Sequence, residues 1–233
     1  MQVSRLLPPL FCALLLAACV MAPPPRILAP AAAVRANILR LAEQEWRAFG
    51  GQIVRYAVDG HEIIDPVGTW EDEGKGAALV AKYWRGIGAD WTGFDGDKPW
   101  SAAFISWVMA SAGAPADEMP ASATHAGYLR AAIAGTGNSV HWRAHPPEAY
   151  APRPGDLICA LRAGQTVTKF DEIPAQASLH CDIVLLAGDG RLESIGGNVR
   201  NSVTRSERQL GLDGRLSGNA GRRWFLVLEN LYP

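Results

Sequence analysis

The first half of the chain carries apolar residues at the spacing of amphipathic helices. In residues 32–49 they stand three and four positions apart, as at Val34, Ile38 and Leu41, so one helical face can pack on a core. The stretch 100–112 is the best-delimited helix, because Pro99 precedes its first turn and Gly113 follows its last. The same pattern predicts further helices over 76–86 and 122–133.

Beyond residue 135 the pattern changes to short apolar segments typical of strands. They cover 156–161, 181–186, 192–195, 202–204 and 224–228. A further short hairpin is expected near Asp59-Gly60, and residues 187–191 have the composition of a hairpin turn. Helices followed by antiparallel strands predict an α+β fold, with N-terminal helices packed on a small antiparallel sheet or half-barrel.

The N-terminus has the pattern of an export signal. Arg5 precedes an apolar run over 6–16, which is too short to span a bilayer. The run ends in Leu16-Ala17-Ala18-Cys19, which resembles the bacterial lipobox, in which the cysteine is lipidated. We therefore expect a signal peptide over 1–18 and lipidation of Cys19; an ordinary cleaved signal is the alternative. Val20, where an aspartate is absent, resembles the sorting signal of enterobacterial lipoproteins of the outer membrane, which implies that location, with the protein facing the periplasm.

The remainder divides into a tether and one domain. Residues 19–33 are rich in proline and alanine and predict a semi-rigid tether, and 34–233 have the length of a single domain. Without Arg5 the chain has 21 basic and 23 acidic residues, so a nucleic-acid partner is not expected. The domain has two cysteines, Cys159 and Cys181. Two buried free thiols are the favoured interpretation, and a disulfide in an oxidising compartment is the alternative.

Three segments carry candidate chemistry. Ser101 stands at a helix start, where unpaired N–H groups could hold an oxyanion, although serine there often only caps the helix. His180 and Asp182 share one face of a predicted strand. If Ala187 faces Arg191 across a three-residue turn, His180 faces Asn198 on the next strand. Asn198, or else Asp182, would then orient the His180 imidazole.

His125 and Tyr128 are a further pair that could border a cleft. They stand three positions apart, at the start of the predicted helix 122–133, and so share a helical face. A solvent-facing histidine at a helix end is the alternative. Trp100 is a candidate stacking residue beside Ser101, with burial in the core as its alternative.

The order of these motifs resembles that of papain-like cell-wall peptidases of the CHAP and NlpC kind. Their nucleophile motif is similar to the run from Trp100 to Trp107, with cysteine in place of Ser101, and their histidine and glycine motifs resemble 180–184 and 197–198. The stretch from Gly68 to the C-terminus is more closely similar to a bacterial family, domain of unknown function 2272, in which serine at this position is usual. The resemblance implies a papain-like fold and a Ser101–His180–Asn198 arrangement.

Serine in place of cysteine changes the chemistry that we expect. A serine hydroxyl is not ionised in advance as a thiol is, so a base must remove its proton during attack. The leading hypothesis is an envelope-tethered hydrolase of amide or peptide bonds in peptidoglycan. The alternatives are a non-catalytic lipoprotein that binds wall fragments or a partner, and an esterase or acyltransferase acting on lipid. The sequence has no metal or phosphate-binding motif, so we expect no metal and no cofactor. The oligomeric state is open.

Overall fold

The computed structural model describes residues 30–57, 59–134, 140–167, 169–216 and 222–233. The expected signal peptide, Cys19 and nearly all of the expected tether lie outside the described residues. The first helix begins at Ala31, so the last residues assigned to the tether form its first turn. None of the helices in the described ranges has the length and apolar character needed to cross a membrane.

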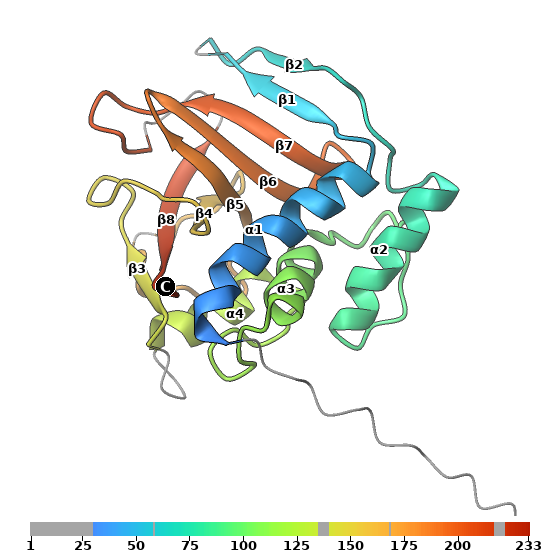
Figure 1. Ribbon diagram of the computed structural model, residues 1–233, viewed down its shortest axis with the longest axis horizontal. Helices are drawn as coiled ribbons and strands as arrows, with labels where there is room; N and C mark the ends of the chain where they lie inside the picture. Colours follow the sequence, from blue (N-terminus) through green and yellow to red (C-terminus); the bar gives the residue numbers. More distant parts are fainter. Residues whose placement is uncertain (1–29, 58, 135–139, 168, 217–221) are drawn as a thin grey trace, which may run out of the picture.

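The described residues form four helices and an eight-stranded mixed sheet, which is an α+β arrangement (Figure 1). The helices are α1 (Ala31–Ala48), α2 (Gly74–Gly86), α3 (Ser101–Ala112) and α4 (His125–Ala134). The strands are β1 (Ile53–Tyr56), β2 (Glu62–Ile64), β3 (Trp142–His145), β4 (Leu157–Leu161), β5 (Leu179–Gly188), β6 (Arg191–Val199), β7 (Ser202–Gln209) and β8 (Arg223–Asn230). Each predicted helix is present within three residues of its expected start. Strand β3 was not predicted; it is a four-residue strand at the edge of the sheet.

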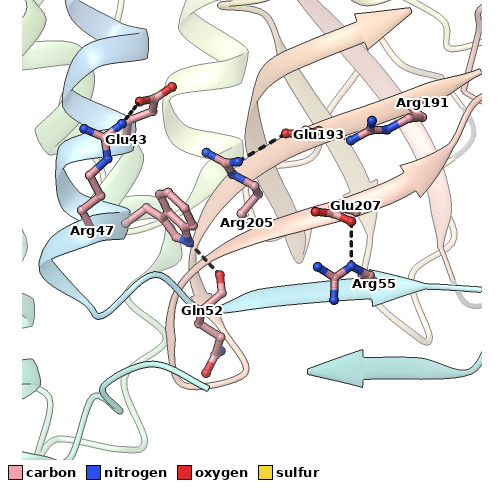
Figure 2. Close-up of polar contacts among 9 residues, drawn as sticks. Glu43, Arg47, Gln52, Arg55, Arg191, Glu193, Arg205 and Glu207 are labelled. Atoms are coloured by element: carbon pink, nitrogen blue, oxygen red, sulfur yellow. Dashed lines mark hydrogen bonds and ion pairs between the residues drawn. The ribbon is translucent and has the colours of Figure 1, made fainter. Parts of the chain in front are cut away.

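The strand order in the sheet is β2-β1-β7-β6-β5-β4-β8-β3. The expectation of a purely antiparallel sheet is wrong, because β1 pairs with β7 in parallel. An ion pair joins the two strands, as Figure 2 shows: Arg55 Nε donates to Glu207 at 2.9 Å. Just before β1, the backbone oxygen of Gln52 accepts from the indole of Trp46 on α1 at 2.7 Å. The side chain of Gln52 also donates to Thr204 Oγ1 at 2.8 Å. Local patterns could not reveal this pairing, since β1 and β7 are far apart in sequence.

Helix α3 lies at the centre of the helical layer. It packs against α1, α2 and α4 on its helix side and against β5 and β6 on its sheet side. Its residues are accordingly small or apolar around the whole circumference, and Phe104, Ile105 and Val108 are fully buried. A helix that is apolar all round is typical of the interior of a domain. This burial fixes the position of the α3 N-terminus relative to the sheet.

The β5–β6 hairpin has a shorter turn than predicted, but the predicted pairing of residues holds in the part of the hairpin away from the turn. Gly188 lies opposite Arg191 across the two-residue turn Asp189-Gly190, whereas a three-residue turn with Ala187 opposite Arg191 was expected. Both turn residues have positive φ, as a tight hairpin turn of this length requires. A one-residue irregularity after Val184 then restores the expected register toward the start of β5.

The two domain cysteines are joined by a disulfide. The favoured interpretation of two free thiols is therefore wrong. Cys159 on β4 and Cys181 on β5 stand directly opposite in the antiparallel register, with 4.1 Å between their Cα atoms. Both residues are fully buried. Periodicity placed each cysteine in the core, but only the pairing of β4 with β5 brings the two sulfur atoms together.

Candidate active site

Ser101 is the first residue of α3 and is almost completely buried. The residue before it, Trp100, is the N-cap, and no side chain caps this helix. The interpretation of Ser101 as a cap is therefore wrong. The backbone N–H groups of the first turn have no partner within the helix, and they lie at the positive end of the helix dipole. Ser101 and Ala102 line a cavity of about 200 Å³.

The hydroxyl of Ser101 is paired with His125, the first residue of α4. Ser101 Oγ and His125 Nε2 are 2.8 Å apart, and both side chains are buried. The other ring nitrogen of His125, Nδ1, is hydrogen-bonded to the hydroxyl of Tyr128. Tyr128 lies one helical turn along α4, on the face that the sequence predicted for the pair. The three groups form a continuous chain from the serine hydroxyl through the imidazole to the phenol.

The start of α4 is held against α3 by a second serine. Ser106 Oγ donates to the backbone oxygen of Ser122 at 3.1 Å and accepts from its N–H at 3.0 Å. Thr124 then caps α4, since its Oγ1 accepts from the N–H of Gly127 at 3.2 Å. A Cβ at Gly127 would come within 2.2 Å of Ser122 Oγ, so this close approach requires glycine. These contacts place His125 beside Ser101.

His180 lies next to His125 rather than beside the serine. His180 Nε2 is 2.8 Å from Asp182 Oδ1, and its ring meets that of His125 edge to face, with 5.6 Å between centroids. The hydrogen bond of Ser101 goes to His125, whereas a bond to His180 was expected. Asp182, the alternative orienting residue, is the partner of His180. The cluster therefore holds two imidazoles in contact, each with its own polar partner.

Asn198 is bonded elsewhere. With its amide oriented to satisfy both neighbours, it donates to Glu71 Oε2 at 3.2 Å, and its oxygen accepts from the backbone N–H of Trp100 at 3.2 Å. Glu71 also accepts from the indole of Trp100. Asn198 and Glu71 thus hold the residue that precedes Ser101 against the end of β6. Trp100 is almost completely buried, so its side chain belongs to the core and offers no open stacking surface.

The two glycines before Asn198 allow this close packing. A Cβ at Gly196 would lie 1.8 Å from Asp182 Oδ1, and a Cβ at Gly197 would lie 2.6 Å from the Cβ of Phe104. The backbone of β6 is therefore covered by the Asp182 carboxylate on one side and by α3 on the other. Larger residues at either position would displace the start of α3 or the His180–Asp182 pair.

Burial and charge set the ionisation of the cluster. Burial, then the neighbouring His180 and Arg162, lower the pKa of His125 well below its usual 6.5, so this imidazole is neutral at pH 7. Burial raises the pKa of Asp182, but His180 and then the arginines outweigh it, and the net result is a lowered pKa. Burial, with Asp182 nearby, raises the pKa of Tyr128 well above 10, so the phenol is neutral.

These ionisation states define what the cluster can do. A neutral imidazole carries one proton. When Nδ1 holds that proton and donates it to the oxygen of Tyr128, Nε2 is free to accept the proton of Ser101. A serine hydroxyl paired with a neutral imidazole, beside unpaired N–H groups at a helix start, matches the requirements of nucleophilic acyl transfer.

A second and larger pocket adjoins the serine cavity. It has a volume of about 520 Å³, and its lining includes His180 and Asn198 together with Arg162 and Arg222. Arg162 lines both hollows. Within the described ranges, no cluster of three or more histidine, cysteine, aspartate or glutamate side chains is arranged to hold a metal ion.

Sequence reasoning found the members of the cluster but not all of their partners. His125 and Tyr128 were recognised as a pair on one helical face, yet nothing in the local pattern pointed to Ser101, which lies 24 positions earlier. Glu71 was not singled out at all, and the sequence around it holds no signal of its contact with Trp100. Arg162 lies just beyond the end of β4 and was not predicted either, because the sequence around it holds no signal that it lines the site.

The chain matches a known protein family over most of its length. Residues 65–229, more than half of the chain, match the model of a family described as an uncharacterized protein conserved in bacteria (DUF2272). No curated protein and no solved structure matches the chain.

Proposed function

The chain belongs to the DUF2272 family of bacterial proteins, and we propose that it is a serine-type hydrolase with Ser101 as its nucleophile. The observation that carries this proposal is the 2.8 Å contact between Ser101 Oγ and His125 Nε2 in a cavity at the start of a helix. The expected fold is a variant of the papain-like arrangement, in which the nucleophile also begins a helix packed on a sheet.

The reaction follows from the positions of these groups. Ser101 Oγ attacks the carbonyl carbon of the substrate while His125 Nε2 takes the hydroxyl proton. The negative charge that forms on the carbonyl oxygen is stabilised by N–H groups of the first turn of α3. His125 then gives its proton to the leaving nitrogen or oxygen, and an acyl ester remains on Ser101. Water, deprotonated by His125, attacks this ester and releases the acid.

Tyr128 and His180 act as positioning residues in this scheme. In the tautomer that the reaction needs, Nδ1 of His125 donates to the oxygen of Tyr128, and this contact holds the ring with Nε2 available as the base. A neutral phenol does not stabilise the imidazolium by charge, as the aspartate of a triad does. The Asp182 carboxylate, in contact with His180, supplies a negative charge near the cluster instead. Asn198 holds the backbone at Trp100 rather than the imidazole.

We propose peptidoglycan as the substrate and the inner face of the outer membrane as the site of action. This part rests on the resemblance to cell-wall peptidases and on the lipobox around Cys19. A domain on a short proline-rich tether reaches only what lies near its membrane, and peptidoglycan lies within that distance. The bond that we expect to be cleaved is an amide or peptide bond of the wall peptide.

The test combines covalent labelling with turnover. The full-length protein is treated with a fluorophosphonate probe and, separately, with purified muropeptides and a p-nitrophenyl ester. We expect labelling and muropeptide hydrolysis that are lost in Ser101→Ala and retained in Ser111→Ala, a control that removes an exposed hydroxyl from the same helix. Equal labelling and turnover by wild type and Ser101→Ala would reject the mechanism. Ester hydrolysis without muropeptide hydrolysis would favour a lipid ester, and binding of wall fragments without labelling would favour a binding protein.

The positioning role of Tyr128 has its own test. Tyr128→Phe keeps the ring and removes the hydroxyl that holds His125 Nδ1. We expect kcat to fall by about tenfold with KM nearly unchanged, since a fixed tautomer matters only for the proton transfer. A merely structural tyrosine would change the unfolding midpoint and leave kcat at the wild-type value.

A further inference from the structure

Two arginines in the larger pocket form no salt bridge with a carboxylate among the described residues. Arg162 follows β4, and Arg222 precedes β8. Arg162 Nε donates to the backbone oxygen of Leu179 at 3.4 Å, and this long contact does not engage the two terminal nitrogens of the guanidinium group. Loss of hydration at the pocket wall, and then the charge of Arg222, lower the pKa of Arg162. The two like charges therefore lie close enough to repel each other across the pocket.

The acidic groups around this pocket are already engaged. Glu62 is paired with Arg200 at the pocket rim. Asp182 is hydrogen-bonded to His180. A third arginine, Arg208, lies behind the wall, with its guanidinium carbon 3.3 Å from the ring centroid of Tyr56. It is 4% exposed; burial lowers the pKa of this guanidinium, whereas the nearby Tyr56 and Asp182 raise it. Arg222 and Arg208 both lie near enough to Asp182 for their charges to lower its pKa, so this one carboxylate is shared among His180 and two arginines.

Arg162 connects this charge to the reaction site. It lines the pocket that holds Arg222 and also the cavity that holds Ser101 and His125. A molecule bound in both hollows would place one group beside Ser101 Oγ and another between the two guanidinium groups. Guanidinium groups favour planar anions with two acceptor oxygens, because each can donate two parallel hydrogen bonds.

We propose that the Arg162–Arg222 pocket is a subsite for a carboxylate of the substrate, next to the bond that Ser101 attacks. The identity of the neighbouring cavity as the reaction site rests on the proposed function, whereas binding of the carboxylate does not. The substrate class is an acyl compound with a free carboxylate close to its scissile bond, such as a short peptide with an unblocked C-terminus. Neutral esters and amidated peptides lack this contact and are poorer ligands.

Binding to an inactive variant tests this subsite separately from catalysis. The full-length Ser101→Ala protein is titrated calorimetrically with N-acetyl-alanyl-alanine, with its C-terminal amide, and with inorganic phosphate. We expect the free acid to bind about tenfold more tightly than the amide, a difference of ~1.4 kcal/mol. Adding Arg162→Gln should abolish this preference. Adding Arg85→Gln, which makes the same charge change on an exposed residue of α2 outside both hollows, should leave it intact.

Each outcome decides the proposal. The carboxylate subsite is supported if the free acid binds more tightly than the amide and if this preference is lost in Arg162→Gln but kept in Arg85→Gln. This holds even if the wild type shows no hydrolysis. Equal binding of acid and amide, absence of measurable binding by both, or a preference that survives Arg162→Gln overturns it. Binding of phosphate without binding of the acid also overturns it, because the pocket would then favour a different class of anion. Loss of hydrolysis in Ser101→Ala alone concerns only the proposed function.

Discussion

The two histidines of the cluster are distinguished by comparing His125→Gln with His180→Gln. Glutamine occupies a volume similar to that of histidine but is not a base. His125 Nε2 lies within hydrogen-bonding distance of Ser101 Oγ, whereas His180 is hydrogen-bonded to Asp182 and its ring lies beside that of His125. General-base catalysis contributes about 10²–10⁴-fold, so His125→Gln should lower kcat/KM by this factor, or ~3–5 kcal/mol.

His180→Gln should have a smaller effect and a different signature. The variant leaves the Ser101–His125 contact intact and removes a neighbour whose charge lowers the pKa of His125. We expect a loss of about tenfold in kcat/KM, the size of a lost positioning contact, and a shift of the acid limb of the pH profile to higher pH. The shift has this sign because the neighbouring charge disfavours protonation of His125, and its removal makes protonation easier.

The rates of fluorophosphonate labelling and of ester hydrolysis are measured for each variant between pH 4 and pH 9. Thermal unfolding of each variant checks that it is folded. A loss in His180→Gln as large as that in His125→Gln would refute the assignment of the base to His125. A folded His125→Gln variant with wild-type rates would refute the mechanism altogether, since no other described imidazole is hydrogen-bonded to Ser101.

Two further predictions concern charge and packing around the site. Arg162→Gln should move the acid limb of kcat/KM to higher pH, because a positive charge that lowers the pKa of His125 is removed. An acid limb that stays in place or moves to lower pH would contradict this. Gly196→Ala places a Cβ 1.8 Å from the Asp182 carboxylate and should destabilise the fold by ~1–3 kcal/mol, measured by urea unfolding. Gly188→Ala, where a new Cβ meets nothing within 4 Å, is the matched control and should unfold within about 1 kcal/mol of the wild type.

Much of the fold was predictable because helices and strands are local structures. Side-chain periodicity identified all four helices in the described part of the chain, since an amphipathic or buried helix must present apolar groups every three to four residues. It also placed His180 and Asp182 on one face of β5, where they are hydrogen-bonded. The parallel β1–β7 pair was not predictable in this way, because pairing between distant strands leaves no trace in either one.

The sequence by itself determined that Ser101 stands at the start of a helix and that His125 shares a face with Tyr128, because local helix signals and helix geometry set these relations. The tertiary structure decided which imidazole meets the serine. That contact depends on how α4 packs on α3, through the bonds between Ser106 and Ser122, and no local pattern encodes it. The disulfide and the pairing of Arg162 with Arg222 in one pocket were also decided by the tertiary structure, because the residues of each pair lie on separate elements that only the fold brings together.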